Sequence, residues 1–166
     1  MDPRRDCGNS IKNFGSQENP LRITFYGGIG EIGGNKIMVE CENSRLLIDF
    51  GRNFRLEDSF FQYPYDPPLD VRDLVRTGIV PDLPELYAEG GAVEAVIISH
   101  AHTDHYGHIP LLAQGTRVLM GETAKMIIDA RLESMARPSW MEKVDHLHIE
   151  TFRTGDEIEL GPFRVR

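Results

Sequence analysis

The feature that most constrains this chain is a six-residue stretch that holds three histidines and one aspartate, His100-Ala-His102-Thr-Asp104-His105. Neutral imidazole and carboxylate groups are the usual protein ligands of zinc and similar divalent ions. The residues just before it, 95–99, form an apolar, largely β-branched run, which predicts a strand buried on both faces of a sheet. We therefore expect the four polar residues on a loop at the carboxyl end of a central strand, where open α/β sheets place their sites. A short helix is expected over residues 106–114.

The spacing within this stretch predicts two pairs of ligands. In extended backbone His100 and His102 point the same way, because side chains alternate, so they can bind one ion together. Asp104 and His105 follow as the chain turns and can face a second ion. Two ions about 3.5–4 Å apart can activate water and stabilise both the attacking and the leaving oxygen of a displacement. The alternative is a surface loop rich in histidine by chance, but four of the six histidines lie between residues 100 and 108.

Length and composition indicate one globular domain. The chain has 166 residues and 40% hydrophobic residues, enough for a core, and no apolar run approaches the roughly 18 residues of a membrane helix. The first six residues lack the apolar core of a signal peptide. With only Cys7 and Cys41, a disulfide framework is not supported, so we expect a cytoplasmic protein without a membrane segment. The net charge of −8 argues mildly against a nucleic-acid face on this segment, since phosphate binding normally uses basic patches.

The glycine-rich segment 27–35 contains G-x-G-x-x-G after a predicted strand at 21–25, a pattern that can bind dinucleotides. That function requires a helix after the glycines. Here residues 36–41 alternate as a strand, and a second strand at 45–49 follows after a short link, which leaves no room for a crossover helix. We expect the glycines to let the backbone bend close to the site instead. Residues 1–20 are polar and are predicted to be a mobile leader ahead of a domain at 21–166.

Asp49 ends the strand expected at 45–49. A carboxylate at the end of a buried strand is unfavourable unless it is paired. We expect Asp49 to accept a hydrogen bond from a ligand histidine or from a metal-bound group. The alternative is an exposed acid at a strand end.

Three motifs together resemble a known family: Gly27-Gly28-x-Gly30-Glu31-Ile32-Gly33-x-Asn35, then Leu47-Ile48-Asp49-x-Gly51, then Ser99-His100-x-His102-x-Asp104-His105-x-Gly107-x-Ile109-Pro110. The last contains H-x-H-x-D-H and resembles the signature of the metallo-β-lactamase superfamily. Over residues 21–135 the chain is similar to the opening of ribonuclease J and its relatives, in the β-CASP branch, which acts on nucleic acids. One departure is His108, where glycine is expected. This histidine could approach the site or face solvent, and we expect it to face solvent.

The resemblance implies an α/β fold, the N-terminal portion of a four-layered αββα sandwich, and a metal-dependent hydrolase, most simply a ribonuclease that cleaves RNA phosphodiester bonds. It implies two divalent metal ions, zinc or manganese, held by His100, His102, Asp104 and His105. Asp104 would also orient the nucleophile, and Asp49 would order the ligands around it. The family's remaining ligands lie further downstream, so we expect this chain to be the N-terminal part of a longer enzyme and inactive alone. Exonuclease or endonuclease cleavage, and a homo-oligomer of the full-length protein, are left open.

Two other functions remain open. A small-molecule hydrolase of the same superfamily, such as a thioesterase, lactonase or phosphodiesterase, would need the same ligands. A non-catalytic interaction subunit could keep the fold without the activity, although the intact ligand set argues against it.

The remaining segments are expected to build the core. The aromatic, proline-rich residues 52–68 are expected to form a loop that packs on the core, or alternatively a wall that stacks bases. Helices are expected at 71–78 and, with an apolar face that includes Ile127, Ile128 and Met135, at 123–135. Strands are expected at 116–120, 151–153, 157–160 and 163–166. His146 and His148 are expected to be surface residues and not ligands.

Overall fold

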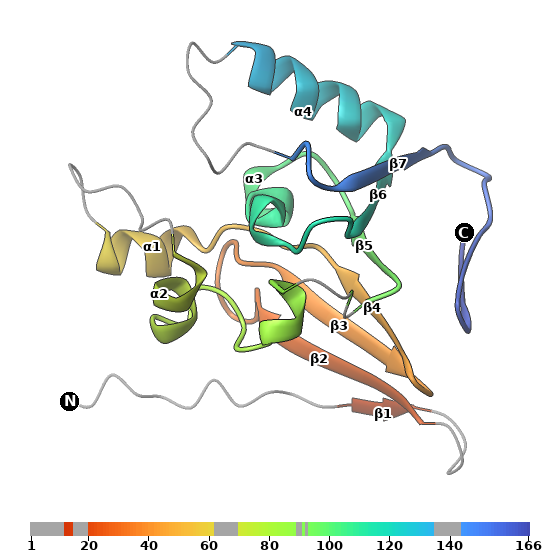
Figure 1. Ribbon diagram of the computed structural model, residues 1–166, viewed down its shortest axis with the longest axis horizontal. Coiled ribbons are helices and arrows are strands. Elements are labelled where there is room, and N and C mark those ends of the chain that lie inside the picture. Colours follow the sequence, from red (N-terminus) through yellow and green to blue (C-terminus); the bar gives the residue numbers. More distant parts are fainter. Residues whose placement is uncertain (1–11, 15–19, 62–69, 89–90, 92, 135–143) are drawn as a thin grey trace.

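A seven-stranded sheet forms the centre of the computed structural model, which describes residues 12–14, 20–61, 70–88, 91, 93–134 and 144–166 (Figure 1). The strands follow one another across the sheet in chain order. Neighbouring strands are antiparallel from β1 as far as the β3–β4 pair. They are parallel from the β4–β5 pair as far as the β6–β7 pair. The strands are β1 (Lys12–Phe14), β2 (Leu21–Gly27), β3 (Lys36–Cys41), β4 (Ser44–Ile48), β5 (Ala95–Ile98), β6 (Arg117–Gly121) and β7 (His148–Phe152).

Helices make the connections between the parallel strands, which cannot be joined by tight turns. Between β4 and β5 lie α1 (Phe54–Phe60), α2 (Val71–Arg76) and the 3₁₀ turn η1 (Pro84–Leu86). Between β5 and β6 lie α3 (Thr103–Tyr106) and the 3₁₀ turn η2 (Ile109–Leu111), and α4 (Glu122–Ser134) joins β6 to β7. Side-chain caps begin the first two helices, because Asn53 accepts a hydrogen bond from the Leu56 amide and Asp70 from the Arg72 amide.

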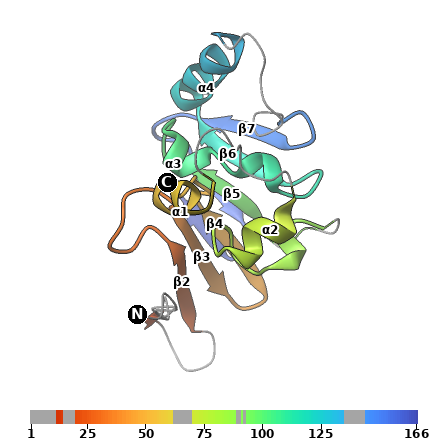
Figure 2. The same cartoon turned by 90° about the vertical axis from the view of Figure 1, so that its left-hand side faces the viewer.

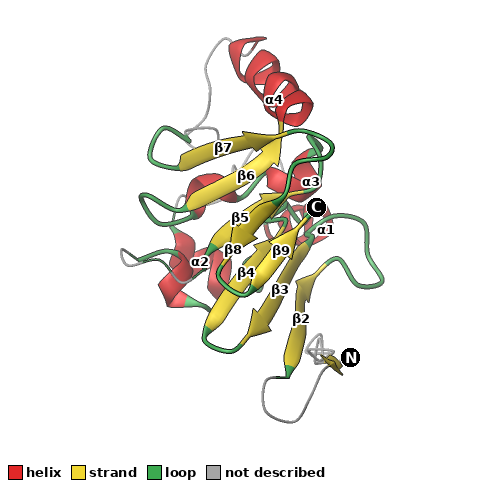
Figure 3. Cartoon of the chain, turned by 90° about the vertical axis from the view of Figure 1, so that its right-hand side faces the viewer, coloured by secondary structure: helices red, strands yellow, loops and turns green. Residues whose placement is uncertain are grey.

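The sheet is buried on both faces, which explains the continuous apolar run of β5. Val96 and Ile98 pack with the helices in the larger core, whereas Ala95 packs on the opposite face with Leu160. That opposite face is covered by a two-stranded hairpin, β8 (Ile158–Leu160) and β9 (Phe163–Val165). Figure 3 shows this hairpin in front of the sheet, with α1, α2 and α3 behind it. The order helix, sheet, strand pair is that of an incomplete αββα sandwich, and the predicted α/β class is confirmed.

Several expected elements differ from the observed ones. The helix expected over 106–114 is instead the short α3, which begins at Thr103, followed by η2. Within the expected loop 52–68, residues 54–60 form α1, because Asn53 supplies a cap; residues 62–69 lie outside the described chain. Residues 12–14 of the expected leader form an edge strand beside β2, and the mobility of the leader stays a prediction.

The last helix also differs from its predicted pattern. Ile128 is buried, but Ile127 is 53% exposed and so does not belong to the core face of α4. Met135, also predicted on that face, lies outside the described residues. In the part of the chain that the structure describes, no helix is long and apolar enough to cross a bilayer. Figure 2 shows α4 at the β7 end of the sheet, beyond α3.

Candidate metal centre

The histidine-rich loop lies at the carboxyl end of β5, with β4 and β6 on either side. The chain leaves β5 at Ile98, bends at His100 and Ala101, and then passes through the extended His102 into α3, which carries Asp104 and His105. The parallel neighbours end at the same edge, so the loop lies where the sheet opens towards solvent. This placement agrees with the sequence-based expectation.

The predicted ligands form two close pairs. His100 Nε2 lies 3.1 Å from His102 Nδ1, and His105 Nε2 lies 3.4 Å from the Asp104 carboxylate. Two ligand atoms each about 2.1 Å from a tetrahedral ion lie roughly 3.4 Å apart, so both pairs have a spacing that two ligands of one ion require. The rings of His100 and His105 are 3.8 Å apart between centroids, which brings the two pairs side by side.

Three or more such side chains do not converge on a single point. Among residues 12–14, 20–61, 70–88, 91, 93–134 and 144–166, no group of three or more histidine, cysteine, aspartate or glutamate side chains is arranged to hold a metal ion. The geometry therefore fits part of two ligand shells and completes neither. We predict that all four side chains converge on one pocket and that their ligand atoms meet around one or two points, and this stays a prediction.

Asp49 lies beside this loop, in contact with one of the predicted ligands. Its carboxylate accepts hydrogen bonds from the Ser99 amide at 2.8 Å and the Ser99 hydroxyl at 2.9 Å, and it lies 2.7 Å from His105 Nδ1. The side chain is 4% exposed, and the backbone has a positive φ of 59°. Such a conformation is unfavourable for a residue other than glycine, and an aspartate tolerates it better than most. The fold thus holds Asp49 in a strained turn that directs its carboxylate at His105.

A second segment holds the loop through its main chain. Phe50 N donates to His105 O, Arg52 N to Thr103 O, and Asn35 N to Asp104 O. Gly51 lies between these contacts, and a Cβ added there would come 1.6 Å from the Asp104 carbonyl oxygen. The glycine is therefore required by a close approach of two backbones, not by its own φ.

The glycine-rich segment approaches the same place. A Cβ added at Gly33 would meet the Asp104 side chain at 3.3 Å, which agrees with the expectation that these glycines bring the backbone close to the site. The Asn35 side-chain amide donates to the Asp104 carbonyl at 3.2 Å and lies 3.2 Å from His105 Nε2. β3 begins directly after it, so the sequence-based argument against a dinucleotide fold is confirmed.

Charged side chains are buried beneath the loop. Lys36 is 1% exposed and donates to the Gly51 carbonyl at 2.6 Å. Burial lowers the pKa of Lys36 to about 7, although Glu57 and Glu31 raise it. Burial would raise the pKa of Glu57, but His108 and Arg52 outweigh it and lower that pKa to about 2.

The prediction that His108 faces solvent is wrong. Its side chain is 2% exposed, and Nε2 lies 3.1 Å from Glu57 Oε1, within ion-pair distance but without hydrogen-bond geometry. Burial lowers the pKa of His108 to about 4 despite the opposing effect of Glu57, so the imidazole is neutral at neutral pH. Glu57 on α1 and the Phe50 ring both lie against the buried imidazole, the latter at 6.3 Å between ring centroids.

The other two histidines lie away from the loop. His148 is exposed at the amino end of β7. The histidine-rich loop, residues 99–105 and named the metal loop from here on, lies at the opposite, carboxyl ends of the parallel strands. His146 Nε2 lies 3.1 Å from the Leu112 carbonyl. Neither histidine contacts the four predicted ligands.

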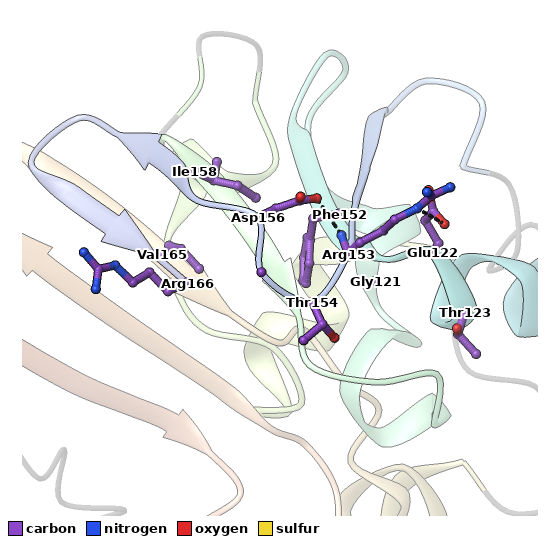
Figure 4. A pocket seen from close by; sticks show the side chains of 11 residues that line it. Gly121, Glu122, Thr123, Phe152, Arg153, Thr154, Asp156, Ile158, Val165 and Arg166 are labelled. Atoms are coloured by element: carbon purple, nitrogen blue, oxygen red, sulfur yellow. Dashed lines mark hydrogen bonds and ion pairs between the residues drawn. The ribbon is translucent and has the colours of Figure 1, made fainter.

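A pocket of about 660 Å³ lies elsewhere at the carboxyl edge, where β6 and β7 end (Figure 4). Its charged side chains are already paired, since Arg153 lies 2.7 Å from Glu122, the Arg153 amide donates to Asp156, and Arg166 lies 3.0 Å from Glu157. A second pocket of about 410 Å³ is lined by α2 and the segment around Tyr87. Neither pocket is lined by a histidine, so the histidine-rich loop is the stronger candidate site.

The fold and this loop define a class of protein. A family model, the metallo-beta-lactamase superfamily, matches residues 29–163. The chain belongs to this superfamily, which confirms the resemblance drawn from the three motifs.

Curated relatives point to a branch within the superfamily. The chain is 35% identical over 92 residues to ribonuclease J of Helicobacter pylori (strain ATCC 700392 / 26695), and 36% identical over 92 residues to ribonuclease J of Mycolicibacterium smegmatis. It is 32% identical over 93 residues to the transcription termination factor FttA of Pyrococcus horikoshii. Each match covers 55% of this chain and only 11%, 14% and 12% of the respective relative.

Solved structures support the fold alone. A protein of unknown function from Enterococcus faecalis V583 matches with a TM-score of 0.66 and 24% identity, over 87% of this chain and 36% of that one. The metallo-beta-lactamase fold protein YhfI from Bacillus subtilis matches with a TM-score of 0.50 and 16% identity, over 87% of this chain and 51% of that one.

Proposed function

We propose that this chain carries the first part of the metal centre of a hydrolase that cleaves phosphodiester bonds in RNA. The observation that carries the proposal is that four predicted ligands form two close pairs at the end of β5. The ligand atoms of His100 and His102 are 3.1 Å apart, and those of Asp104 and His105 are 3.4 Å apart. The similarity to ribonuclease J supports RNA as the substrate, over the small-molecule substrates that the same superfamily accepts.

His100 and His102 would hold one divalent ion, and Asp104 and His105 would hold the second. Imidazole and carboxylate donors suit zinc and also manganese. Ions bound there would supply a nucleophile at neutral pH by lowering the pKa of water, and would stabilise charge on the phosphate oxygens. Ligands from outside the described residues would complete the two shells, and the small share of each ribonuclease J that this chain matches supports a longer protein.

Asp49 would fix the orientation and the tautomer of His105. Its carboxylate lies 2.7 Å from Nδ1, and a carboxylate there keeps the proton on Nδ1. The lone pair is then on Nε2, the nitrogen that lies next to Asp104. Asp104 would bind metal and orient the attacking water, because its carboxylate is partly exposed beside His105.

The test is to measure bound metal and substrate preference on the intact protein. Labelled single-stranded RNA, the same sequence in DNA, an acyl lactone and a thioester would be supplied with zinc or manganese. We expect cleavage of the RNA and its loss in His102→Ala. The matched control is His148→Ala, because His148 is exposed at the opposite edge of the sheet.

Other outcomes would reject the proposal. Hydrolysis of the lactone or thioester without RNA cleavage would identify a small-molecule enzyme. Metal-free protein with no activity on any substrate would identify a non-catalytic interaction subunit.

A further inference from the structure

One arginine of α4 reaches the metal loop. The Nη1 atom of Arg131 donates a hydrogen bond to the hydroxyl of Thr103 at 2.7 Å. Thr103 lies between His102 and Asp104 in the chain, so this hydrogen bond ties the guanidinium to the segment that carries the predicted ligands. Arg131 is exposed, and Figures 1 and 2 show α4 next to α3, which begins at Thr103.

Arg131 differs from most arginines of the chain in its partners. Nine of the eleven arginines that the structure describes lie within 4.0 Å of a carboxylate. Arg131 has no carboxylate partner among the described residues, and its one hydrogen bond there is to a neutral hydroxyl. In a chain of net charge −8, this cation beside the site is not neutralised by a described acidic group.

A guanidinium in this state suits a phosphate. It has five N–H donors in a planar fork, and the Thr103 hydroxyl uses one of them. The others can make charge-assisted, bidentate hydrogen bonds to phosphate oxygens. The tether to Thr103 also removes part of the side-chain freedom that binding would otherwise cost.

We propose that Arg131 is a substrate-binding residue that holds a phosphate of single-stranded RNA next to the metal loop. The inference rests on the proposed function and adds to it the residue that recognises the RNA backbone.

The alternative is that Arg131 only braces α4 against the loop. The two roles differ in their dependence on salt. A residue that contacts one phosphate of a single strand contributes about 0.7 to the slope of log affinity against log salt concentration. A brace would change the metal loop and leave this slope unchanged.

The experiment compares Arg131→Gln and Arg131→Lys with wild type in the intact protein. Binding of a labelled single-stranded oligoribonucleotide is measured by fluorescence anisotropy over a series of KCl concentrations, and cleavage gives KM and kcat. The control is Arg45→Gln, which removes the same charge at the amino end of β4, on the opposite edge of the sheet. Thermal unfolding and zinc content confirm that each variant is folded and loaded.

We expect Arg131→Gln to weaken RNA binding and raise KM about tenfold, the range of a lost charge-assisted hydrogen bond, and to lower the salt slope by about 0.7. Arg131→Lys should keep the slope and recover part of the affinity. Thr103→Val should also keep the slope, because the charge remains.

Three results would overturn the inference. If the wild-type protein cleaves RNA, and Arg131→Gln leaves KM and the salt dependence of binding unchanged, the proposed function stands and Arg131 is not a binding residue. A fall in kcat and zinc content with an unchanged slope would make Arg131 a brace. Wild-type protein that neither binds nor cleaves the RNA would overturn the proposed function together with this assignment.

Discussion

Replacing Asp49 by asparagine tests whether the buried carboxylate controls His105, a predicted metal ligand. The aspartate accepts two hydrogen bonds from Ser99 and lies 2.7 Å from His105 Nδ1. An asparagine keeps one oxygen. If that oxygen faces the Ser99 amide, the side-chain NH₂ group faces His105 Nδ1, and the histidine must then carry its proton on Nε2. If the amide is reversed, its NH₂ group faces the Ser99 amide and that hydrogen bond is lost.

The first arrangement is the less costly for the fold and the more costly for metal binding. A proton on Nε2 blocks the nitrogen that is expected to bind the ion. Loss of such a supporting partner typically lowers metal affinity or activity about 10–100-fold. This corresponds to about 1.4–2.7 kcal/mol. We expect this loss in zinc affinity and in RNA cleavage, with a smaller effect on thermal unfolding.

The assay is a competition titration of zinc against a chromophoric chelator, followed by RNA cleavage at saturating zinc. Asp73→Asn is the control, because Asp73 is half-exposed on α2 and pairs with Arg76 at 3.3 Å. Unchanged zinc affinity and cleavage in Asp49→Asn would refute the reasoning. An equal loss in both variants would show a general effect of charge.

Three further predictions concern the support of the loop and its metal. Gly51→Ala should lower activity at least tenfold and lower the melting temperature, because its Cβ would come 1.6 Å from the Asp104 carbonyl oxygen, whereas Gly121→Ala, where a Cβ meets nothing within 4 Å, should have little effect. The free energy of unfolding should fall as pH drops from about 6.5 to about 4, because His108 takes up a proton in the unfolded chain before its folded-state pKa of about 4 is reached. Protonation of His108 contributes a slope of about 1.4 kcal/mol per pH unit to the free energy of unfolding in this range. The His108→Gln substitution should remove this slope when chemical denaturation is measured at a series of pH values. Dialysis against EDTA should abolish RNA cleavage, and added zinc or manganese should restore it. The 166-residue chain alone should lose zinc readily, because its described ligands form only pairs. Cleavage by the chelated protein, or tight retention of two ions by the chain alone, would contradict this.

The sequence predicted most of the strands and the position of the loop, because both depend on local patterns; it missed β1 and placed β7 at 151–153, three residues after its observed start at His148. The apolar run at 95–98 could only be a strand covered on both faces, and polar residues after it had to lie at the edge of the sheet. The placement of Asp49 followed from the same argument. These inferences need no knowledge of distant partners.

The contacts that the sequence did not predict join residues far apart in the chain. His108 is buried because Glu57, 51 positions earlier, lies on α1 against it. A lone histidine carries no signal for such a partner, and the aromatic composition of 52–68 concealed the helix. The Arg131–Thr103 contact spans 28 positions and likewise depends on how α4 packs. Only Asn35 and Gly51 had a local signal, as members of the quoted motifs.

The strictly sequential order of the sheet has a consequence for how the protein forms during synthesis. Each new strand from β2 to β7 is added beside the one made just before it, so the growing sheet never waits for a strand from later in the chain. The glycine-rich segment, the turn at Asp49 and the histidine loop all lie between residues 27 and 108. These segments emerge from the ribosome before β6 does, so none of them has to wait for a later strand to supply its neighbour in the sheet. The scaffold of the metal loop is therefore available early to the ligands that complete it.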